Sequence, residues 1–246
     1  GIWLKFVKKI SLKISYKQFI PILFLGLFFS LSSLTLFSAF KYIEAGIACT
    51  ILFIYPVLVA LIMALFFKEK ITKTVIFSII LTSIGVVLLY KGKSGIDLNL
   101  HGVAIVFTSA LLYALYIVGV KNIKTIKHIR PTVLSFYVML CGLLVYIYNL
   151  KFCTQLQPLD RPVLWLYAIG LSVIPTIISL ETITIAIKII GSTTTALLGA
   201  LEPLTAIFFG VLFFHEQLTL RIIIGVILIL LGVFLIILRK KHRAAE

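Results

Sequence analysis

Acidic residues are scarce in this sequence. Asp and Glu account for 8 of its 246 residues, against 23 Lys and Arg, and there are four His, two Met and two Trp. Hydrophobic residues make up 61% of the chain. This composition excludes a water-soluble globular protein and is typical of proteins that cross a membrane several times. We therefore expect an all-α polytopic membrane protein with the lipid bilayer as its surroundings.

Groups that could hold a metal or form a disulfide are also few. Cys49, Cys141 and Cys153 have no paired spacing, and the four histidines do not cluster along the chain. This pattern predicts no disulfide framework, no metal site and no cofactor. A membrane enzyme would need a concentrated set of His, Asp or Cys at one membrane face, and none occurs. We therefore expect no catalytic residues and no enzymatic activity.

The net charge of +15 would suit a nucleic-acid partner, but its distribution argues against one. Nearly all basic residues lie between apolar runs, as topology signals do. With eight spans and the amino end inside, inner segments hold 17 of the 23 Lys and Arg, and outer loops hold six. Because cytoplasmic loops are enriched in basic residues, we expect both termini in the cytoplasm and a location in the plasma membrane, such as the bacterial inner membrane. The expected spans are Phe19–Phe40, Ala45–Phe67, Thr74–Tyr90, His101–Val120, Val133–Asn149, Val163–Ile187, Ser192–Phe214 and Ile222–Leu238.

The most informative stretch covers residues 191–237, where a short polar break separates two apolar runs. The run Ser192–Phe214 has 23 residues, enough to cross the hydrocarbon core, so Glu202 and Pro203 are expected near the bilayer midplane. An ionisable side chain there costs about 2.5–3.5 kcal/mol and faces a bundle interior or a wet cavity rather than lipid. This pair is therefore the first candidate for a functional site.

The same pattern occurs 147 residues earlier, which indicates an internal duplication. A proline, a glutamate, a threonine and a glycine recur at this one offset without a gap. The two prolines lie on spans that cross in opposite directions, so the repeats are expected to be inverted. Matched interruptions in two inverted halves are typical of the binding region of secondary transporters. The matched pairs are Pro56 and Pro203, Glu69 and Glu216, Thr72 and Thr219, and Gly85 and Gly232.

The duplication also predicts the organisation of the chain. The second half contains two spans, within residues 101–150, whose counterparts would fall at position 3 and below. We therefore expect an inverted five-plus-five protein of which eight transmembrane helices are present and the first two are lacking. The expected units are a basic segment that ends a lost span at 1–18, three helices of the first repeat at 19–93, five helices of the second repeat at 94–238, and a basic tail at 239–246.

Two longer segments carry a resemblance to a known family. Pro175–Ile237, with GSTTTALLGALEPLTAIFFGVLFFHEQLT followed by GVILILLGVF, resembles the second repeat of the EamA-type branch of the drug/metabolite transporter superfamily, and AGIACTILFIYPVLVALIMALFFKEKIT matches the first repeat more loosely. The resemblance implies ten helices in two inverted repeats, a central cavity between the halves and movement of small metabolites across a plasma membrane. We therefore expect a secondary transporter that exposes a midplane cavity alternately to each side, with protons and a second copy of the chain as candidate partners. A channel-like protein or a non-transporting subunit of a membrane assembly is the alternative.

The two prolines can act in two ways. Pro203 cannot donate to the carbonyl of Gly199, which lies one turn earlier and has no side chain to oppose a bend. Irregular backbone inside a membrane is tolerated only within protein or beside a water-filled cavity. Pro203 and Pro56 are therefore either hinges in unwound segments that line a solute path or ordinary kinks packed against neighbours. Tyr55 precedes Pro56 at the place where Glu202 precedes Pro203.

Two glutamates inside the spans are open to more than one interpretation. Burial disfavours a charged carboxylate, so Glu202 either carries a proton or contacts an amine on the solute, or else stays protonated and donates to the carbonyl that Pro203 frees. Glu181 either lines a cavity, or reaches toward the inner surface, or pairs with Lys188 on the same helix face.

Glu69 and Glu216 end their spans and are interpreted as helix-end structure. Each precedes a threonine, Thr72 or Thr219, of a type that caps the next helix.

Hydroxyl and aromatic side chains within the spans complete the candidate set. Most of them should form hydrogen bonds between helices, and a minority should contact a solute. The seven-residue pairs Ser78/Gly85 and Gly225/Gly232 are interpreted instead as close helix packing. The cavity candidates of this kind are Ser33, Ser38, Tyr55, Tyr113, Tyr116, Tyr137, Ser179, Thr193 and Thr195.

Overall fold

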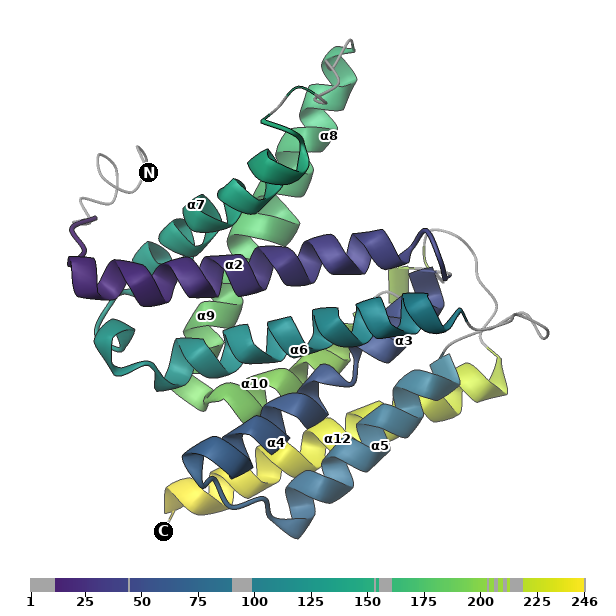
Figure 1. Cartoon of the computed structure of the whole chain (residues 1–246). Helices are drawn as coiled ribbons and strands as arrows, with labels where there is room; N and C mark the ends of the chain where they lie inside the picture. Colours follow the sequence, from purple (N-terminus) through teal and green to yellow (C-terminus); the bar gives the residue numbers. More distant parts are fainter. Residues whose placement is uncertain are drawn as a thin grey trace.

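The computed structural model describes residues 12–43, 45–89, 99–152, 154, 161–202, 204, 205, 208, 209, 212 and 219–245. All regular secondary structure in this part of the chain is helical, so the all-α prediction is confirmed (Figure 1). The elements are α2 Tyr16–Ala39, α3 Ala45–Leu52, α4 Tyr55–Phe67, α5 Lys73–Leu89, α6 Leu100–Asn122, the 3-10 turn η1 Lys124–Ile126, α7 Pro131–Asn149, α8 Pro162–Ser172, the π-helical turn η2 Val173–Ile178, α9 Ser179–Ile190, α10 Ser192–Leu198, the 3-10 turn η3 Gly199–Leu201 and α12 Leu220–Ala245.

Several of these helices are long and apolar enough to cross a bilayer, which makes the protein a multi-pass membrane protein. Each expected span contains helix among its described residues. Four segments of the described chain reach membrane-spanning length without a break, and the others are shorter apolar helices. The four are Tyr16–Ala39, Leu100–Asn122, Pro131–Asn149 and Pro162–Ile190, and the shorter helices are Tyr55–Phe67, Lys73–Leu88 and Leu220–Leu235.

The second expected span, Ala45–Phe67, is interrupted next to Pro56. Helix α3 ends at Leu52 and α4 begins at Tyr55, with Phe53 and Ile54 in a turn between them. Pro56 has no N–H, so the carbonyl of Leu52 cannot receive its usual helical hydrogen bond, and the α3 helix ends at that point. The span is therefore made of two half-helices.

The sixth and eighth spans also differ from their expected bounds. Helix runs from Pro162 through η2 to Ile190, and η2 contains Pro175, whose missing N–H favours the wider π-helical turn. Helix α12 continues to Ala245, beyond the expected end of its span, so the basic residues that follow the last span extend the same helix.

Helices α5 and α12 pack through two contacts that the offset of 147 relates to each other. A Cβ added to Gly85 would lie 2.8 Å from the carbonyl oxygen of Gly225, and one added to Gly232 would lie 3.0 Å from that of Ser78. The Ser78 hydroxyl also donates to the Gly232 carbonyl at 2.5 Å. At the offset of 147, Ser78 corresponds to Gly225 and Gly85 corresponds to Gly232. The two contacts are therefore equivalent under the symmetry that relates the repeats. The predicted close packing is confirmed, and the two equivalent helices are antiparallel.

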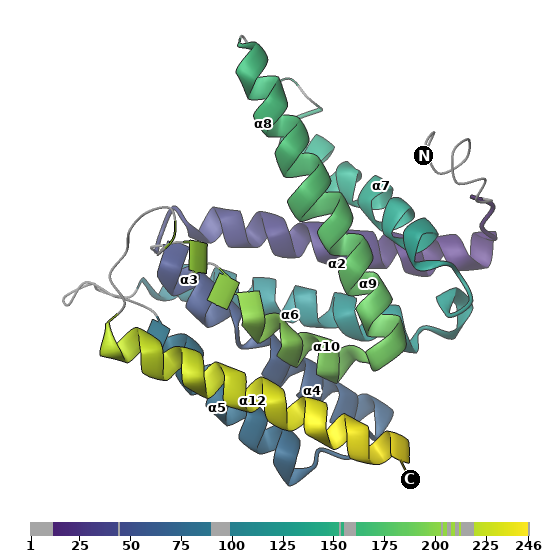
Figure 2. The same cartoon turned by 180° about the vertical axis from the view of Figure 1, so that it is seen from behind.

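The two interrupted spans are antiparallel as well. Tyr55 at the start of α4 lies against Gly199, and Glu69, just after α4, accepts a hydrogen bond from Thr193 near the start of α10. The residue number therefore rises along one helix as it falls along the other, and Figures 1 and 2 show α3–α4 and α10 running in opposite directions. Equivalent elements of the two halves thus cross the molecule in opposite senses, as inverted repeats require.

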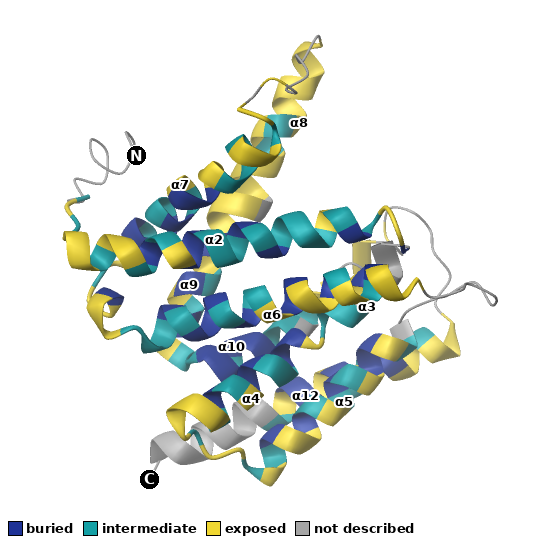
Figure 3. Ribbon diagram, viewed as in Figure 1, coloured by how far each residue is buried: buried dark blue, intermediate teal, exposed yellow. Residues whose placement is uncertain are grey.

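The main core lies where α2, α4, α6, α7, α9 and α10 meet. Its buried residues include Ile22 of α2, Val59 of α4, Tyr116 of α6, Leu134 of α7 and Leu180 of α9. Helix α2 packs along α6 and α7. Helix α8 has no buried residue and extends away from this core (Figure 3). The bundle is therefore well packed around the interrupted helices and open around α8.

Candidate functional site

A cavity of about 190 Å³ lies beside the breaks in the two interrupted spans. It is smaller than the roughly 300 Å³ at which pockets for drug-sized ligands begin, so it suits a small solute. Five of the residues singled out from the sequence line it, and they come from both halves of the chain. The lining residues are Tyr55 of α4, Tyr113 and Ile117 of α6, Thr182, Ile183 and Ala186 of α9, Thr195 and Leu198 of α10, Gly199 of η3, and Glu202.

At the first break, Pro56 interrupts the helical hydrogen-bond pattern directly after Tyr55, which lines this cavity. Ile54 donates to the carbonyl of Ile51 at 3.0 Å, a tighter turn than an α-helix, and Leu58 donates to Ile54 at 3.1 Å to start α4. Pro56 itself is buried within the protein. The interruption is therefore held inside the bundle, where irregular backbone is tolerated.

The second break falls at the equivalent positions. The 3-10 turn Gly199–Leu201 corresponds to Leu52–Ile54 at the offset of 147, and Glu202 follows it as Tyr55 follows the first break. Pro203 lies outside the described residues. In both repeats a non-α turn therefore ends directly before the residue that precedes the proline.

Gly199 is needed for a close approach between the two halves. A Cβ added at this position would lie 1.8 Å from the hydroxyl oxygen of Tyr55 and 3.1 Å from its Cζ. Any side chain at residue 199 would therefore displace the Tyr55 ring. The sequence predicts a bend at Gly199, whereas the structure shows that the glycine also seats an aromatic side chain from the other repeat.

Aromatic rings form one wall of the site. The ring of Tyr55 meets that of Tyr113 edge to face, with centroids 5.0 Å apart, and Tyr113 stacks on Tyr116 at 6.2 Å. Tyr116 is fully buried behind this wall, and its hydroxyl lies 3.2 Å from that of Thr184, which also receives a hydrogen bond from Ser135 at 3.1 Å. Tyr55 and Tyr113 therefore face the cavity, while Tyr116 supports them from the core.

Glu202 is the one Asp, Glu, Lys, Arg or His among the residues that line the cavity. Its side chain is exposed, and it lies close enough to Cys49, Tyr55 and Tyr113 to interact electrostatically with each. The Thr205 hydroxyl donates to the Glu202 backbone carbonyl at 2.7 Å. Among the described residues no basic side chain forms an ion pair with this carboxylate. The cavity therefore contains an acidic group to which the described residues supply no cation.

The expected pairing of Glu181 with Lys188, one of three alternatives for this acid, is wrong. The hydroxyl of Thr132 on α7 donates to Glu181, and the ammonium of Lys188 donates to the backbone carbonyls of Ile126 and Ile129 in the turn before α7. Glu181 does not line the cavity, although its neighbours Thr182 and Ile183 do. The acid faces α7 because a shift of one residue along a helix turns a side chain by about 100°.

Hydrogen bonds join the helix ends near Glu69, Lys121 and Lys188, here called the basic end. Besides the bond from Thr193 to Glu69 at 3.2 Å, Lys121 donates to the Lys188 carbonyl at 3.0 Å, and Ser192 donates to the carbonyl of Ile117 at 3.0 Å. These contacts connect α4, α6, α9 and α10 on one side of the cavity. Of these bonds, the one from Thr193 to Glu69 joins the two halves of the chain, and the other two lie within the second half.

The interpretation of Glu69 as helix-end structure is confirmed. Lys68 has a positive φ of 54° that ends α4, and the N–H of Glu69 donates to the Met63 carbonyl at 3.1 Å. The predicted caps behave differently. The Thr219 hydroxyl accepts from the N–H of Ile222 at 3.4 Å, whereas the hydroxyl of Thr72 is buried without a hydrogen-bond partner, so its expected side-chain cap is wrong. Glu216 lies outside the described residues.

The remaining candidates lie away from the cavity. Ser38 donates to the Leu34 carbonyl of its own helix at 2.8 Å, and Tyr137 donates to the carbonyl of Leu12 at 2.8 Å. Ser33 and Ser179 are half-buried and are not among the lining residues. Conversely, the apolar lining residues were not predicted, because nothing in their type distinguishes them from core residues. These are Ile117, Ile183, Ala186 and Leu198.

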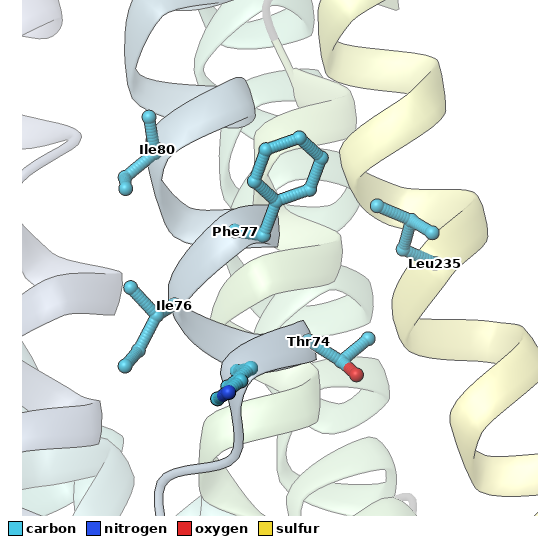
Figure 4. Close-up of a pocket in the computed structure, with 6 residues that line it drawn as sticks. Thr74, Ile76, Phe77, Ile80 and Leu235 are labelled. Carbon is cyan, nitrogen blue, oxygen red and sulfur yellow. The ribbon is translucent and has the colours of Figure 1, made fainter.

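A larger hollow of about 430 Å³ lies between α5 and α12 (Figure 4). Its lining includes Ile76, Phe77 and Ile80 of α5, all of them exposed, with Leu235 of α12 opposite. Exposed apolar side chains on a membrane helix suit contact with lipid acyl chains. None of the residues expected at the functional site lines this hollow, so the smaller cavity at the breaks is the candidate site.

Comparison with known proteins agrees with this architecture. A model of the EamA-like transporter family matches residues 1–91 and 100–238, so the chain belongs to that family of membrane transporters. Two proteins of Archaeoglobus fulgidus, each named an uncharacterized transporter, are similar to it. One is 28% identical over 212 residues, which cover 86% of this chain and 74% of the relative. The other is 25% identical over 210 residues, which cover 81% and 70%.

A solved structure, described as the crystal structure of a protein, has the same fold. It superposes with a TM-score of 0.78 and covers 98% of this chain and 84% of its own, at 17% sequence identity. At that identity the likeness supports the fold alone. The family match and the two named relatives, in turn, point to a membrane transporter rather than an enzyme.

Proposed function

We propose that this protein is a secondary transporter that moves a small metabolite by alternating access through the cavity at the helix breaks. The observation that carries the proposal is the pairing of two antiparallel helices, interrupted at equivalent positions, beside one cavity. Discontinuous helices in inverted repeats bring unpaired backbone groups to a substrate site near the bilayer midplane. The cavity size supports a small solute, with protons as a candidate coupling ion at Glu202.

The distribution of charge supports a location in the plasma membrane with the basic end toward the cytoplasm. Gln18 near the start of α2 donates to the carbonyl of Thr125 in η1, so the first helix begins at the basic end. Helix α12 ends at the same side of the bundle (Figure 1). Both described ends of the chain are therefore assigned to the cytoplasmic side, which is the side enriched in basic residues.

The contacts at the basic end give the transport cycle a closed state. To release a solute toward the cytoplasm, α4 must separate from α10, which breaks the hydrogen bond between Thr193 and Glu69. The half-helix breaks supply the hinges for that movement, because a few residues without α-helical hydrogen bonds absorb the change in backbone angles. The structure supports a state closed at the basic end.

We also propose that two further helices cover the α8–α9 face in the assembled transporter. At the offset of 147, α2 corresponds to the helix Pro162–Ile190, and α2 is covered by α6 and α7. Ile22 of α2 is 0% exposed, whereas its counterpart Ile169 is 57% exposed. Inverted symmetry therefore supports a helix pair of the α6–α7 type as the occupant of this face, and completes a five-plus-five arrangement.

Transport can be tested without knowing the solute. Liposomes that contain the purified protein are loaded with a small-molecule extract of cells, and the solutes released are identified by mass spectrometry. We expect protein-dependent release that Gly199→Ala reduces at least tenfold and Thr108→Ala preserves, since Thr108 is exposed on α6 and bonds within its own helix. Release that is equal with and without protein would contradict the proposed function. Release that neither saturates with solute concentration nor is accelerated by the same solute outside would indicate a channel.

A further inference from the structure

We propose that the solute carried in this cavity is a small organic cation, with an ammonium group and no carboxylate. The inference rests on the proposed transport function. Glu202 supplies the one formal charge among the lining residues, and among the described residues it has no basic partner. A carboxylate at membrane depth faces a wet cavity or is neutralised by a positive charge, which here the solute or a proton would bring.

The aromatic wall favours the solute as the source of that charge. Tyr55 and Tyr113 both line the cavity, and both lie within electrostatic range of Glu202. Aromatic rings attract an alkylammonium group through their faces, more strongly where water is excluded. A carboxylate beside two aromatic rings provides both halves of an ammonium site, whereas a proton needs only the carboxylate.

The rest of the lining excludes other classes of ligand. Ile117, Ile183 and Leu198 present hydrocarbon, which suits carbon groups on the solute rather than a metal ion that needs several oxygen ligands. The hydroxyls of Thr182 and Thr195 already donate to carbonyls of their own helices, at 2.8 and 2.7 Å, so toward the solute they act as acceptors. No basic side chain among the lining residues could hold a solute carboxylate.

Three probes of nearly equal shape separate the possibilities. Choline is a cation, glycine betaine is a zwitterion with the same trimethylammonium group, and 3,3-dimethylbutan-1-ol is the neutral analogue of choline. We expect the purified protein to bind choline at least about tenfold more tightly than either of the other two, because its quaternary ammonium, which has no N–H to donate, gains an ion pair with the carboxylate and cation–π contacts worth about that much. Equal binding of choline and the neutral analogue would overturn the proposal.

Variants assign the binding to the cavity. Glu202→Gln should weaken choline binding at least about tenfold, and Tyr113→Leu about three- to thirtyfold. Tyr113→Phe keeps the ring and should change affinity less than about threefold. Glu181→Gln is the matched control, because that intramembrane acid is bonded to Thr132 outside the cavity, and it should leave binding unchanged. Equal losses in the Glu202 and Glu181 variants would overturn the assignment.

The release assay keeps this inference separate from the transport function. If the liposomes release only neutral or anionic solutes, transport stands and the cation proposal fails. If a pH gradient drives their release and Glu202→Gln removes that dependence, Glu202 is a proton site instead, and the proposal fails in that way. If ammonium compounds dominate the released solutes and Glu202→Gln abolishes their release, the proposal is supported.

Discussion

Replacing Gly199 with alanine should disrupt the site through one identifiable clash. The new Cβ would lie 1.8 Å from the Tyr55 hydroxyl oxygen, so the two groups must move apart by about 1.6 Å to reach ordinary contact near 3.4 Å. Overpacking of this kind costs about 1–3 kcal/mol and moves the ring out of the cavity wall. We expect transport to fall at least tenfold, with a lower midpoint of thermal unfolding in detergent.

A second substitution tests whether that clash is the cause. With Tyr55→Phe the hydroxyl is gone, and the nearest atom to the new Cβ is Cζ at 3.1 Å, which requires a shift of only about 0.3 Å. The double variant Gly199→Ala with Tyr55→Phe should therefore recover most of the lost stability and part of the transport. Thr108→Ala, on the exposed face of α6, serves as the control away from the cavity. If the double variant is as impaired as Gly199→Ala alone, the reasoning is refuted.

Other features of the structure make separate predictions. Thr193→Val removes the hydrogen bond to Glu69 and should shift the equilibrium toward opening at the basic end by about two- to tenfold. A cysteine in the cavity should then be labelled faster from that side. An unchanged labelling rate would show that this bond does not hold the closed state. Gly85→Leu should lower stability against denaturing detergent by about 1–3 kcal/mol, because the α5–α12 contact has no room for a side chain, and unchanged stability would contradict that packing. A cysteine at Ile169 should be as protected from a lipid-soluble thiol reagent in cell membranes as one at Ile22; rapid labelling at Ile169 alone would argue against helices covering α8.

Residues of unusual type for a membrane span were visible in the sequence. A proline or a glutamate among so many Ile and Leu stands out, and the shared offset predicted both the interrupted helices and their opposite directions. Pro56 and Glu202 were found in this way, and Tyr55 was found by its place before Pro56. The helix break itself followed from the missing N–H of proline, whose effect on the backbone is local.

Features that depend on which side of a helix faces inward were not predictable. Tyr113 and Tyr116 are three residues apart, yet one lines the cavity and the other is buried behind it. Glu181 and Thr182 are adjacent, and only Thr182 reaches the cavity. In a helix that is apolar all round, the pattern of hydrophobic residues does not mark the inner face. Packing between helices that are distant in the sequence determines which of these side chains face the cavity.

The central claim is that the cavity at the paired breaks opens alternately to the two sides of the membrane. It is tested most directly with a Thr195→Cys variant, free of the native cysteines, and a charged thiol reagent added to one side at a time; Thr108→Cys, on the exposed face of α6, is the control. We predict that residue 195 reacts from either side, that a condition which raises its rate from one side lowers it from the other, and that residue 108 reacts from neither. Labelling of residue 195 from neither side, or rates from both sides that rise and fall together, would contradict the claim.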